Sequence, residues 1–519
     1  MVGVSEKQQK VEHRNRPTGE AFLTFMRQNW APRDEQLPPL TEAARYAASR
    51  RETVSAAFPG ERLVIPAGGL KIRSNDTDYV FRPHSAFAHL TGLGADREPD
   101  AVLVLDPVTG EDGTPSGHEA VLYFLPLADR DSEEFFADSR VGEFWVGSRP
   151  TLESASSELG LTTRHLGELP DGLAKDTGVG GVSVRVVREA DREVAALVDT
   201  VRQQAGLVEE EQVEAAVQAD AALARSLSTQ RLVKDDWEVR QMEEAVEATA
   251  TAFDAVVEQL PEAASRGRGE RWVEGVFGLH ARHTGNGVGY DSICAAGEHA
   301  TTLHWTRNTG EVQEGQLLLL DAGVEVDSLY TADVTRTVPV SGTFSPAQRR
   351  VYEAVLEAQE AGLAAARPGH RFKDVHAAAI EVIARHLLEW GLLPEGVSLE
   401  QTLDAQEGQF HRRWMVHGTS HHLGIDVHDC ALALREDYVE GELREGMILT
   451  VEPGLYFKSD DLLVPEELRG IGVRIEDDIV ITADGHRNLS AMLPRTADEV
   501  EAWVQAGGVR HGAGSGHAG

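Results

Sequence analysis

The chain has 519 residues, enough for two domains, and its shares of hydrophobic (41%) and charged (26%) residues are those of a globular protein. Its 49 lysine and arginine residues stand against 85 acidic ones, and the resulting net charge of −36 disfavours nucleic acid as a partner. Because the acidic residues are spread along the whole sequence, they indicate a solvated surface, and an acid points to function only where its neighbours are apolar.

The sequence carries no sign of export or of a membrane anchor. The segment Met1–Arg16 is polar and mixed in charge, without the apolar core of a secretory signal. No apolar run approaches the roughly 20 residues that span a bilayer. The two cysteines, Cys294 and Cys430, are too few for a disulfide framework. We therefore expect a soluble, cytoplasmic protein that does not bind membranes.

The first part of the chain predicts a mixed α/β domain. Residues 1–40 contain four prolines and are expected to form a partly flexible arm with a short helix. Beyond them, short apolar runs such as 101–105 and 120–124 alternate with helical segments and are bounded by glycine and proline. Helical periodicity over 185–228 closes this domain, which we place at 1–228.

We place the second domain at 229–505. An amphipathic helix over 239–260 opens it, because apolar residues recur there at three- and four-residue steps. Two more helices are predicted, one from Ser345 to Pro368 and one from Lys373 to Trp390, each with favourable start or stop residues. The glycine- and histidine-rich tail 506–519 is expected to be disordered.

Four acidic residues of the second domain interrupt or end apolar strands. Asp321 ends the run 317–320, and Glu452 directly follows an apolar strand. Glu476 lies inside another apolar stretch. Asp333 follows Asp321 by twelve residues, across a turn that brings adjacent antiparallel strands together. A bare carboxylate is too costly to bury, so each must be hydrogen-bonded, paired or bound to a cation.

Each acid taken alone also has a purely structural explanation. Asp321 or Asp333 at a strand end can accept hydrogen bonds from backbone N–H groups. Glu476 can form a plain ion pair with Arg474, which lies two residues earlier on the same strand face. The functional interpretation therefore depends on reading the acids together.

Histidines cluster between the two pairs of acids. His417, His421, His422 and His428 fall within twelve residues, although the whole chain has only 20 histidines. A lone histidine is more often a core or surface residue than a ligand, but this glycine-flanked cluster favours ligation. The pattern alone does not say which histidine binds.

Four carboxylates and one imidazole together predict a shared site for hard divalent cations. Without cations the carboxylates would repel one another and take up protons, whereas two divalent ions balance their four charges. Oxygen-dominated ligation favours Mn²⁺, although Co²⁺, Zn²⁺ or Fe²⁺ also fits by geometry. The absence of a cysteine ligand argues against a structural zinc site.

Five motifs carry a family resemblance: Leu-Leu-Asp-Ala-Gly (319–323), Ala-Asp-Val-Thr-Arg-Thr (332–337), the histidine-rich run 417–429, Val-Glu-Pro-Gly-Leu-Tyr (451–456) and Arg-Gly-Ile-Gly-Val-Arg-Ile-Glu-Asp-Asp (469–478). On these motifs, residues 229–505 closely resemble Xaa-Pro aminopeptidase (aminopeptidase P). That enzyme belongs to the pita-bread metallopeptidase family, with prolidase and methionine aminopeptidase. Residues 60–170 resemble its N-terminal domain more loosely. The resemblance implies an α/β (α+β) fold, with a mixed α/β domain followed by a pita-bread metallopeptidase domain.

The resemblance assigns the metal ligands. It implies that Asp321 binds one ion and His421 the other. Asp333 and Glu476 would bridge or nearly bridge the two ions, and Glu452 would complete the second.

The resemblance also assigns residues around the metals. His304, His417 and His428 match the family's outer histidines, which position the substrate and stabilise the tetrahedral intermediate. Arg474 matches an outer arginine, and Tyr456 matches an active-site tyrosine.

Two departures from the family pattern are visible. Asp321 and Asp333 are twelve residues apart, one more than in relatives, so the turn between them must absorb a residue. His422 stands where relatives often carry a bulky aromatic residue, which leaves the substrate preference open.

The implied activity is release of the N-terminal residue from peptides with proline in second position, by metal-activated water. A homo-oligomer, dimer or tetramer, is also implied. Glu452 is our hypothesis for the group that carries the water's proton to the leaving proline nitrogen. His304 and His428 would stabilise the oxyanion, and a pocket near His417 would accept the proline ring.

Three other functions are weaker alternatives. Prolidase shares the chemistry but is restricted to dipeptides. A metal-free binding module with the same fold would have lost ligands, and all five are present. A nucleotide site at the glycine-rich run 285–289 is disfavoured because that run precedes a strand instead of following one.

Overall fold

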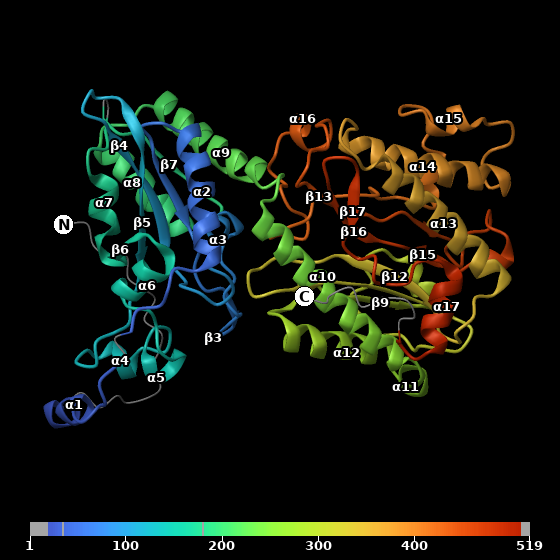
Figure 1. Ribbon diagram of the computed structural model, residues 1–519, viewed down its shortest axis with the longest axis horizontal. Helices are drawn as coiled ribbons and strands as arrows, with labels where there is room; N and C mark the ends of the chain where they lie inside the picture. The colour runs from blue at the N-terminus through green and yellow to red at the C-terminus, as the bar shows by residue number, and fades with distance from the viewer. Residues whose placement is uncertain (1–18, 34–35, 179–180, 510–519) are drawn as a thin grey trace. The chain divides into compact units, whose positions relative to one another are not determined.

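The computed structural model describes residues 19–33, 36–178 and 181–509 (Figure 1). The first half of the predicted flexible arm and the predicted tail from 510 therefore lie outside the described residues. The chain divides into two compact units, one made of Met1–Gly92 and Glu98–Val217 and the other of Leu93–Arg97 and Gln218–Gly519. The division falls within α9 (Glu210–Gln230), which carries the chain from one unit to the other.

The N-terminal unit is built on a five-stranded mixed sheet with strand order β6-β5-β4-β1-β7. Its strands are β1 (Arg62–Pro66), β4 (Val102–Thr109), β5 (Pro115–Phe124), β6 (Thr162–His165) and β7 (Val184–Val186), beside the hairpin β2 (Ile72–Ser74) and β3 (Thr77–Asp78). The inner pairs are antiparallel, whereas β6 and β7 lie parallel to their neighbours. This arrangement confirms the mixed α/β domain predicted from the alternating apolar runs.

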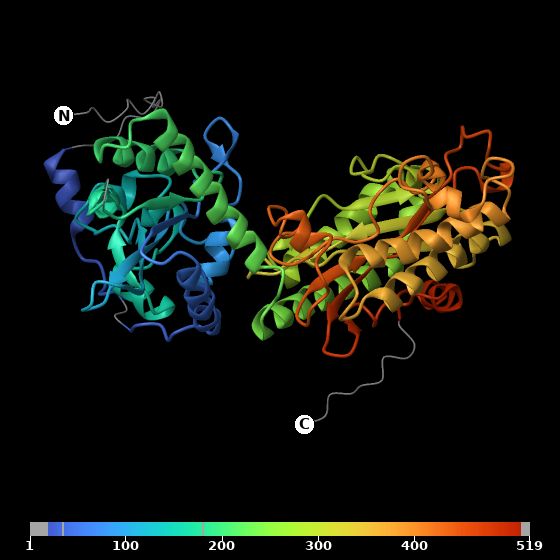
Figure 2. The same ribbon diagram turned by 90° about the horizontal axis from the view of Figure 1, so that it is seen from above.

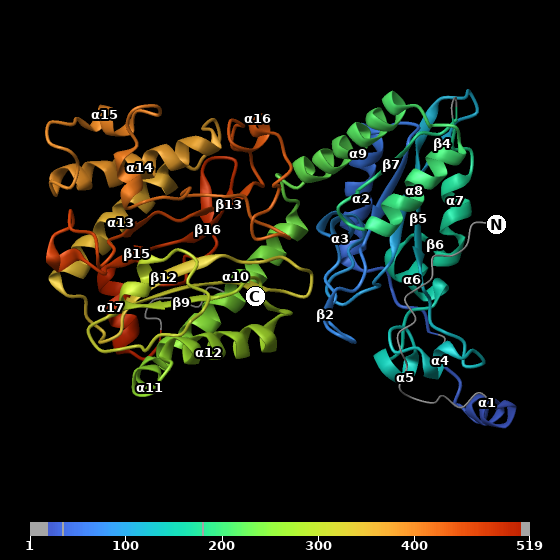
Figure 3. The same ribbon diagram turned by 180° about the vertical axis from the view of Figure 1, so that it is seen from behind.

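Helices cover both faces of this sheet (Figures 1 and 3). The helices of the unit are α1 (Glu20–Arg27), α2 (Glu42–Ala57), α3 (Ser85–Thr91), α4 (Glu134–Ala137), α5 (Glu143–Val146), α6 (Leu152–Leu159), η1 (Leu166–Glu168), α7 (Leu169–Ala174) and α8 (Arg192–Gln204). Buried aliphatic residues of α7 and α8 pack against valines of the central strands and form the core on one face. Helix α2 lies on the other face (Figure 1).

The C-terminal unit contains short sheets between two layers of helices (Figures 1 and 2). Its strands are β8 (Gly287–Val288), β9 (Ile293–Ala296), β10 (Leu317–Ala322), β11 (Val324–Glu325), β12 (Val334–Pro339), β13 (Ile448–Val451), β14 (Gly454–Tyr456), β15 (Gly472–Arg474), β16 (Asp477–Ile481) and β17 (His486–Asn488). They pair in the orders β12-β10-β9, β11-β8, β13-β16-β17 and β14-β15.

Helices α10 and α12 lie on one side of these strands, and α13 and α14 lie on the other (Figure 1). The helices of the unit are α10 (Asp236–Glu258), α11 (Leu260–Ser265), α12 (Gly269–Thr284), η2 (Gly297–Thr301), α13 (Pro346–Ala365), α14 (Phe372–Glu389), α15 (Leu399–Leu403), η3 (Phe410–Arg413), α16 (Arg435–Tyr438), η4 (Glu466–Leu468) and α17 (Ala497–Gln505). Their apolar faces share one core with the strands. The three helices predicted in this region are α10, α13 and α14.

The strand register places the end of the sheet that contains β10 and β12 beside the segment that carries Glu476. Asp321 of β10 lies opposite Thr335 of β12, and Thr335 forms an isolated bridge with Glu476. A second isolated bridge joins His422 to Leu449 of β13. Among the described residues, no helix is long and apolar enough to cross a membrane.

Candidate metal centre

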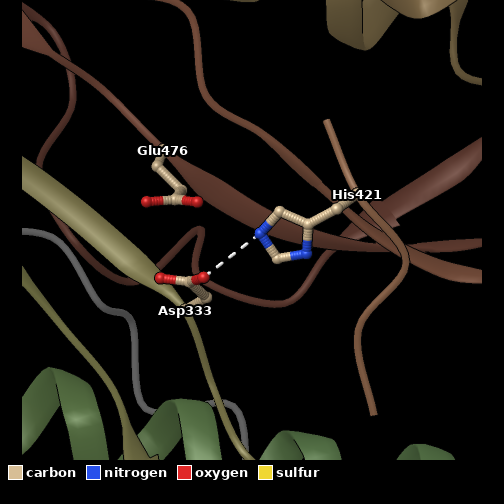
Figure 4. Close-up of side chains that lie close together, drawn as sticks. All are labelled: Asp333, His421 and Glu476. Carbon is tan, nitrogen blue, oxygen red and sulfur yellow. Dashed lines mark ion pairs between the residues drawn. The ribbon is translucent and has the colours of Figure 1, made fainter. Parts of the chain in front are cut away.

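Three of the predicted ligands converge on one point in the C-terminal unit. Asp333, His421 and Glu476 each offer a ligand atom, and these atoms all lie within 4.8 Å of one another (Figure 4). His421 Nε2 is 3.2 Å from a carboxylate oxygen of Asp333. Asp333 and Glu476 are buried, with 6% and 2% of their surface exposed. The three residues come from strand ends and a loop that are far apart in the sequence.

Short backbone links hold Glu476 in this place. It lies between β15 and β16, where its N–H donates to the carbonyl of Thr335 at 3.1 Å. In return, the Thr335 hydroxyl donates to the Glu476 carboxylate at 2.6 Å. Because Thr335 is two residues after Asp333, this pair of hydrogen bonds fixes both carboxylates relative to each other.

Asp321 joins the group through a tyrosine that the sequence did not single out. The hydroxyl of Tyr290 donates to Asp321 at 2.8 Å and is also in contact with the Asp333 carboxylate. The residue follows a glycine-rich turn, and nothing in its local pattern marks it as functional. Its role becomes visible only when strand pairing brings the two aspartates together.

Glu452 approaches the group from the end of β13. Its N–H donates to the carbonyl of Thr419 at 2.8 Å, which ties it to the histidine-bearing loop. One carboxylate oxygen lies 3.7 Å from His421 Nε2, and the other lies 3.6 Å from His417 Nδ1. All five residues that were predicted as ligands therefore line one small region.

The electrostatics of this region show a shortage of positive charge. Burial raises the pKa of Asp321, Glu452 and Glu476, and the neighbouring carboxylates raise it further, to about 7 for Glu452. Burial lowers the pKa of His421, but its hydrogen bond to Asp333 and the charge of Glu452 outweigh that effect and raise it to about 9. Without a metal, these acids and His421 therefore bind protons more readily than usual, and a cation could take the place of those protons. The oxygen-rich donor set and this charge deficit fit divalent cations.

Arg474 provides the positive charge nearest to Asp321. Its guanidinium forms an ion pair with the Asp321 carboxylate and donates to the hydroxyl of Tyr456 at 3.0 Å and of Thr335 at 3.2 Å. Within the described part of the chain, its ion pair is with Asp321 and not with Glu476. The alternative of a plain Arg474–Glu476 pair is therefore not what the structure contains.

The outer histidines lie around the group, each in a different setting. His417 Nε2 is 2.8 Å from the Tyr456 hydroxyl, and burial lowers its pKa to about 3. The ring of His428 meets that of His421 edge to face at 4.5 Å. Burial is the largest cause of the lowered pKa of His428, and the imidazoles of His421 and His304 add to it. His304 also lowers the pKa of His417, so its imidazole acts electrostatically on both.

His422 faces away from this group. It is fully buried, and its ring stacks on Phe372 with centroids 4.9 Å apart and meets Tyr438 edge to face at 4.6 Å. Successive residues of an extended segment point to opposite sides, so the neighbour of His421 must enter the core. The structure therefore gives no support to a substrate-binding role for His422, whose ring packs in the core as an aromatic side chain would.

Two family models match the chain. One describes metallopeptidase family M24 and matches residues 240–483, and the other describes the N-terminal domain of aminopeptidase P and matches residues 47–180. The matched ranges contain all nine residues predicted as ligands or as catalytic groups, which are His304, Asp321, Asp333, His417, His421, His428, Glu452, Arg474 and Glu476.

Curated proteins and solved structures agree with these matches. Xaa-Pro aminopeptidase 1 of Streptomyces coelicolor is 51% identical over 93% of this chain and 91% of its own length. Xaa-Pro aminopeptidase of Escherichia coli is 33% identical over 90% of this chain and 99% of its own. The structure of E. coli aminopeptidase P in its low-pH form has a TM-score of 0.76 and 31% identity, covering 89% of this chain and 98% of that one. Another structure of that enzyme, with the inhibitor Pro-Leu, has a TM-score of 0.74 and 30% identity, covering 91% of this chain and 99% of that one.

Proposed function

The chain belongs to metallopeptidase family M24, as its five motifs indicated, and we propose how its residues carry out the reaction of an Xaa-Pro aminopeptidase. It is a hydrolase that releases the N-terminal residue from peptides with proline in second position. Identity of 51% over almost the whole chain to Xaa-Pro aminopeptidases carries this conclusion. The metallopeptidase family implies a divalent metal.

Two Mn²⁺ ions per subunit are the proposed cofactor. The residues that would hold them are Asp321, Asp333, His421, Glu452 and Glu476. When bound, such ions polarise the scissile carbonyl and lower the pKa of water. The proposal of two ions is supported by the number of carboxylates, since four negative charges exceed what one divalent ion neutralises.

Glu452 is the proposed proton carrier. A carboxylate can accept a proton from water and pass it on to a leaving nitrogen. It lies between His417 and His421, within 3.7 Å of each, on the side where the other carboxylates converge. We assign it the transfer of a proton from the attacking water to the leaving proline nitrogen.

The outer histidines are proposed to act on the substrate. His304 and His428, both exposed at the edge of the site, would donate hydrogen bonds to the carbonyl oxygen as negative charge develops on it. His417 is held by the hydroxyl of Tyr456, which in turn accepts from Arg474. We propose that this chain of contacts orients His417 toward the proline ring.

The proton-transfer role is tested with Glu452→Gln. We expect kcat to fall by at least about 10²-fold, because general acid–base groups contribute about 10²–10⁴-fold. Metal content measured on the same samples separates this effect from loss of an ion. Full activity at unchanged metal content would remove Glu452 from that role.

The substrate class is tested with peptide length and metal. We expect the chelated protein to be inactive and to regain hydrolysis of a tripeptide Xaa-Pro-Yaa when Mn²⁺ is added. Prolidase, the alternative with the same chemistry, would cleave only the dipeptide Xaa-Pro. A strict preference for the dipeptide would favour prolidase, and a lack of response to any divalent ion would contradict the metal site.

Cellular location and assembly are further proposals. Both cysteines are free and buried, which agrees with a reducing compartment, and we propose the cytoplasm. A homo-oligomer, dimer or tetramer, is proposed from the family resemblance alone. Light scattering on the purified protein measures its mass directly, and a monomer at working concentration would contradict this.

A further inference from the structure

Glu270, at the start of α12, is a fully buried acid outside the metal centre, with 0% of its surface exposed. Each of its carboxylate oxygens faces two donors. One oxygen accepts from the N–H of Ala296 at 2.9 Å and from Nδ1 of His299 at 2.7 Å. The other accepts from the indole N–H of Trp305 at 2.9 Å and from the N–H of Gly310 at 2.5 Å. The carboxylate is therefore held by four hydrogen-bond donors.

The four donors all belong to the segment 296–310, which follows β9 and carries His304. They are spread over its start, its middle and its end, so one side chain ties down the whole segment. The backbone adds a further bond from the N–H of Glu270 to the carbonyl of Gly310 at 3.2 Å. A methyl group at Gly310 would lie 2.8 Å from the Glu270 carboxyl carbon, so only glycine permits this approach.

Trp305, the donor that follows His304 in the sequence, is also held by ring stacking. The ring of His299 stacks on Trp305 with centroids 3.9 Å apart and an angle of 23° between the planes. Both rings thus donate to Glu270 while packing on each other. Trp305 in turn is partly buried against the small cluster that includes Leu319 of β10, the strand of Asp321.

His304 itself is exposed, and its imidazole makes no hydrogen bond to any described residue. The position of its imidazole must therefore come from the backbone on either side of it. That backbone is the part of the segment held by Trp305 and by the turn after η2.

We propose that Glu270 is a positioning residue that sets the place of His304 by holding the segment 296–310 at four donors. This inference rests on the role of His304 in the proposed function. It adds a residue on α12, more than thirty positions earlier in the sequence, to the groups that determine the rate of the reaction.

Glutamine cannot replace Glu270, although it has the same shape. Its amide offers one accepting oxygen and one donating NH₂ group. At either carboxylate position the NH₂ group would face a permanent N–H donor, that of Ala296 on one side and those of Trp305 and Gly310 on the other. At least one buried N–H is then left unpaired, and the segment must shift.

The test is a double-mutant cycle of Glu270→Gln with His304→Ala, measured as kcat and KM on an Xaa-Pro-Yaa peptide at saturating Mn²⁺. We expect Glu270→Gln alone to lower kcat about 10- to 100-fold, because a displacement of about 1 Å of a catalytic group has that effect. In the His304→Ala background the same change should lower kcat by less than about twofold, since the group it positions is absent. Metal content should be unchanged in all variants.

Two further variants keep the test decisive. Trp305→Phe removes one donor and leaves the carboxylate. If Glu270→Gln does not fold, Trp305→Phe replaces it in the double-mutant cycle with His304→Ala, and we expect a smaller loss of kcat in the same direction. Asp254→Asn is the matched control, because Asp254 on α10 accepts the indole N–H of Trp503 at 3.0 Å in the same way. We expect it to lower stability at most and to leave kcat unchanged in both backgrounds.

The outcomes separate the inference from the function on which it rests. If the parent protein fails to cleave the peptide, the proposed function fails. If the parent is active but His304→Ala is equally active, the role of His304 and the inference both fail. If Glu270→Gln lowers kcat by the same factor with and without His304, Glu270 acts on the domain in general and the inference alone is overturned.

Discussion

Tyr290 links two carboxylates through a single hydroxyl group, and burial raises its pKa well above the usual value, with Asp321 and Asp333 adding to the rise. The hydroxyl therefore stays protonated, and its single proton can be donated to either of the two aspartates. Such an outer hydrogen bond orients a metal ligand without touching the metal.

Replacing this tyrosine tests that view. We expect Tyr290→Phe to weaken binding of Mn²⁺ about 10- to 100-fold, the usual cost of losing a group that orients a ligand. Calorimetric titration of the chelated protein measures this directly. Tyr352→Phe is the matched control, because Tyr352 is also buried but donates to the carbonyl of Arg495. Equal metal affinity in the two variants would contradict the role of Tyr290.

The protons held at the site predict how the metal-free protein responds to pH. The folded-state pKa of Glu452 is raised from 4.5 to about 7, so its protonated form is favoured by folding. The folded state then binds more protons than the unfolded state, and stability falls as pH rises between these values. His421, with a pKa raised from 6.5 to about 9, contributes stability at low pH that is lost as pH rises through 9.

We therefore expect the unfolding temperature of the chelated protein to fall between about pH 6.5 and pH 9, where Glu452 and His421 lose their protons while buried histidines of lowered pKa, such as His417, are neutral in both states. Saturating Mn²⁺ should remove most of this fall, because the cation takes the place of the protons. Scanning calorimetry at several pH values gives the comparison. A stability of the chelated form that rises over this range would contradict the charge deficit.

At the scale of elements, the loop that carries the histidines is fastened to the start of the catalytic unit by a buried charge cluster. Asp429 accepts from Arg231 at 2.9 Å and from Lys234 at 3.3 Å, and the side chains of Asp429 and Lys234 are fully buried. Burial raises the pKa of Asp429, but the charges of Arg231 and Lys234 outweigh it and hold that pKa below its usual value. The acid stays ionised directly beside His428.

Removing this charge should destabilise the unit strongly. We expect Asp429→Asn to lower the free energy of unfolding by about 3–5 kcal/mol, because it leaves Lys234 without its ion pair and Arg231 with only the longer one to Asp426. Chemical denaturation measures the loss. Asp461→Asn serves as the comparison, since its partner Arg413 is half exposed and such pairs contribute about 0–1 kcal/mol. Similar losses of unfolding free energy in both variants would show that the buried cluster stabilises the unit no more than the half-exposed pair does.

The elements that the sequence predicted well are those with local signals. The helix start at Ser345 is marked by a favourable N-cap residue followed by Pro346, and α13 begins where that pair indicates. The buried acids were visible because apolar residues flank them in the sequence. Tyr290 and Glu270 were not visible, because their partners are brought near only by strand pairing and loop folding. The role of His422 stayed open for the same reason, since the direction of its side chain depends on the bridge to Leu449.

At the scale of the whole molecule, each of the two units has a hydrophobic core of its own. Valines and leucines around the mixed sheet form that of the N-terminal unit, and the helices and strands around the site share that of the C-terminal unit. A protein with two cores does not have to unfold in one step. All the proposed ligands lie in the C-terminal unit, so metal binding should stabilise that unit selectively.

Metal removal therefore gives the last prediction. We expect two unfolding transitions in calorimetry, of which one moves upward by several degrees when Mn²⁺ is added to the chelated protein. An ion present at 1,000 times its dissociation constant adds about 4 kcal/mol, enough for such a shift. Hydrogen exchange on the same samples should place the gained protection in residues 218–509 and not in 36–178.

The acidic composition makes a control necessary. With a net charge of −36, the protein attracts divalent cations all over its surface, and this attraction alone could raise both transitions. Asp333→Asn changes that net charge by only one unit but removes a proposed ligand from the centre of the site. If binding at the site causes the shift, this variant should lose most of it. A shift that survives in Asp333→Asn, or that moves both transitions together, would assign the effect to surface charge.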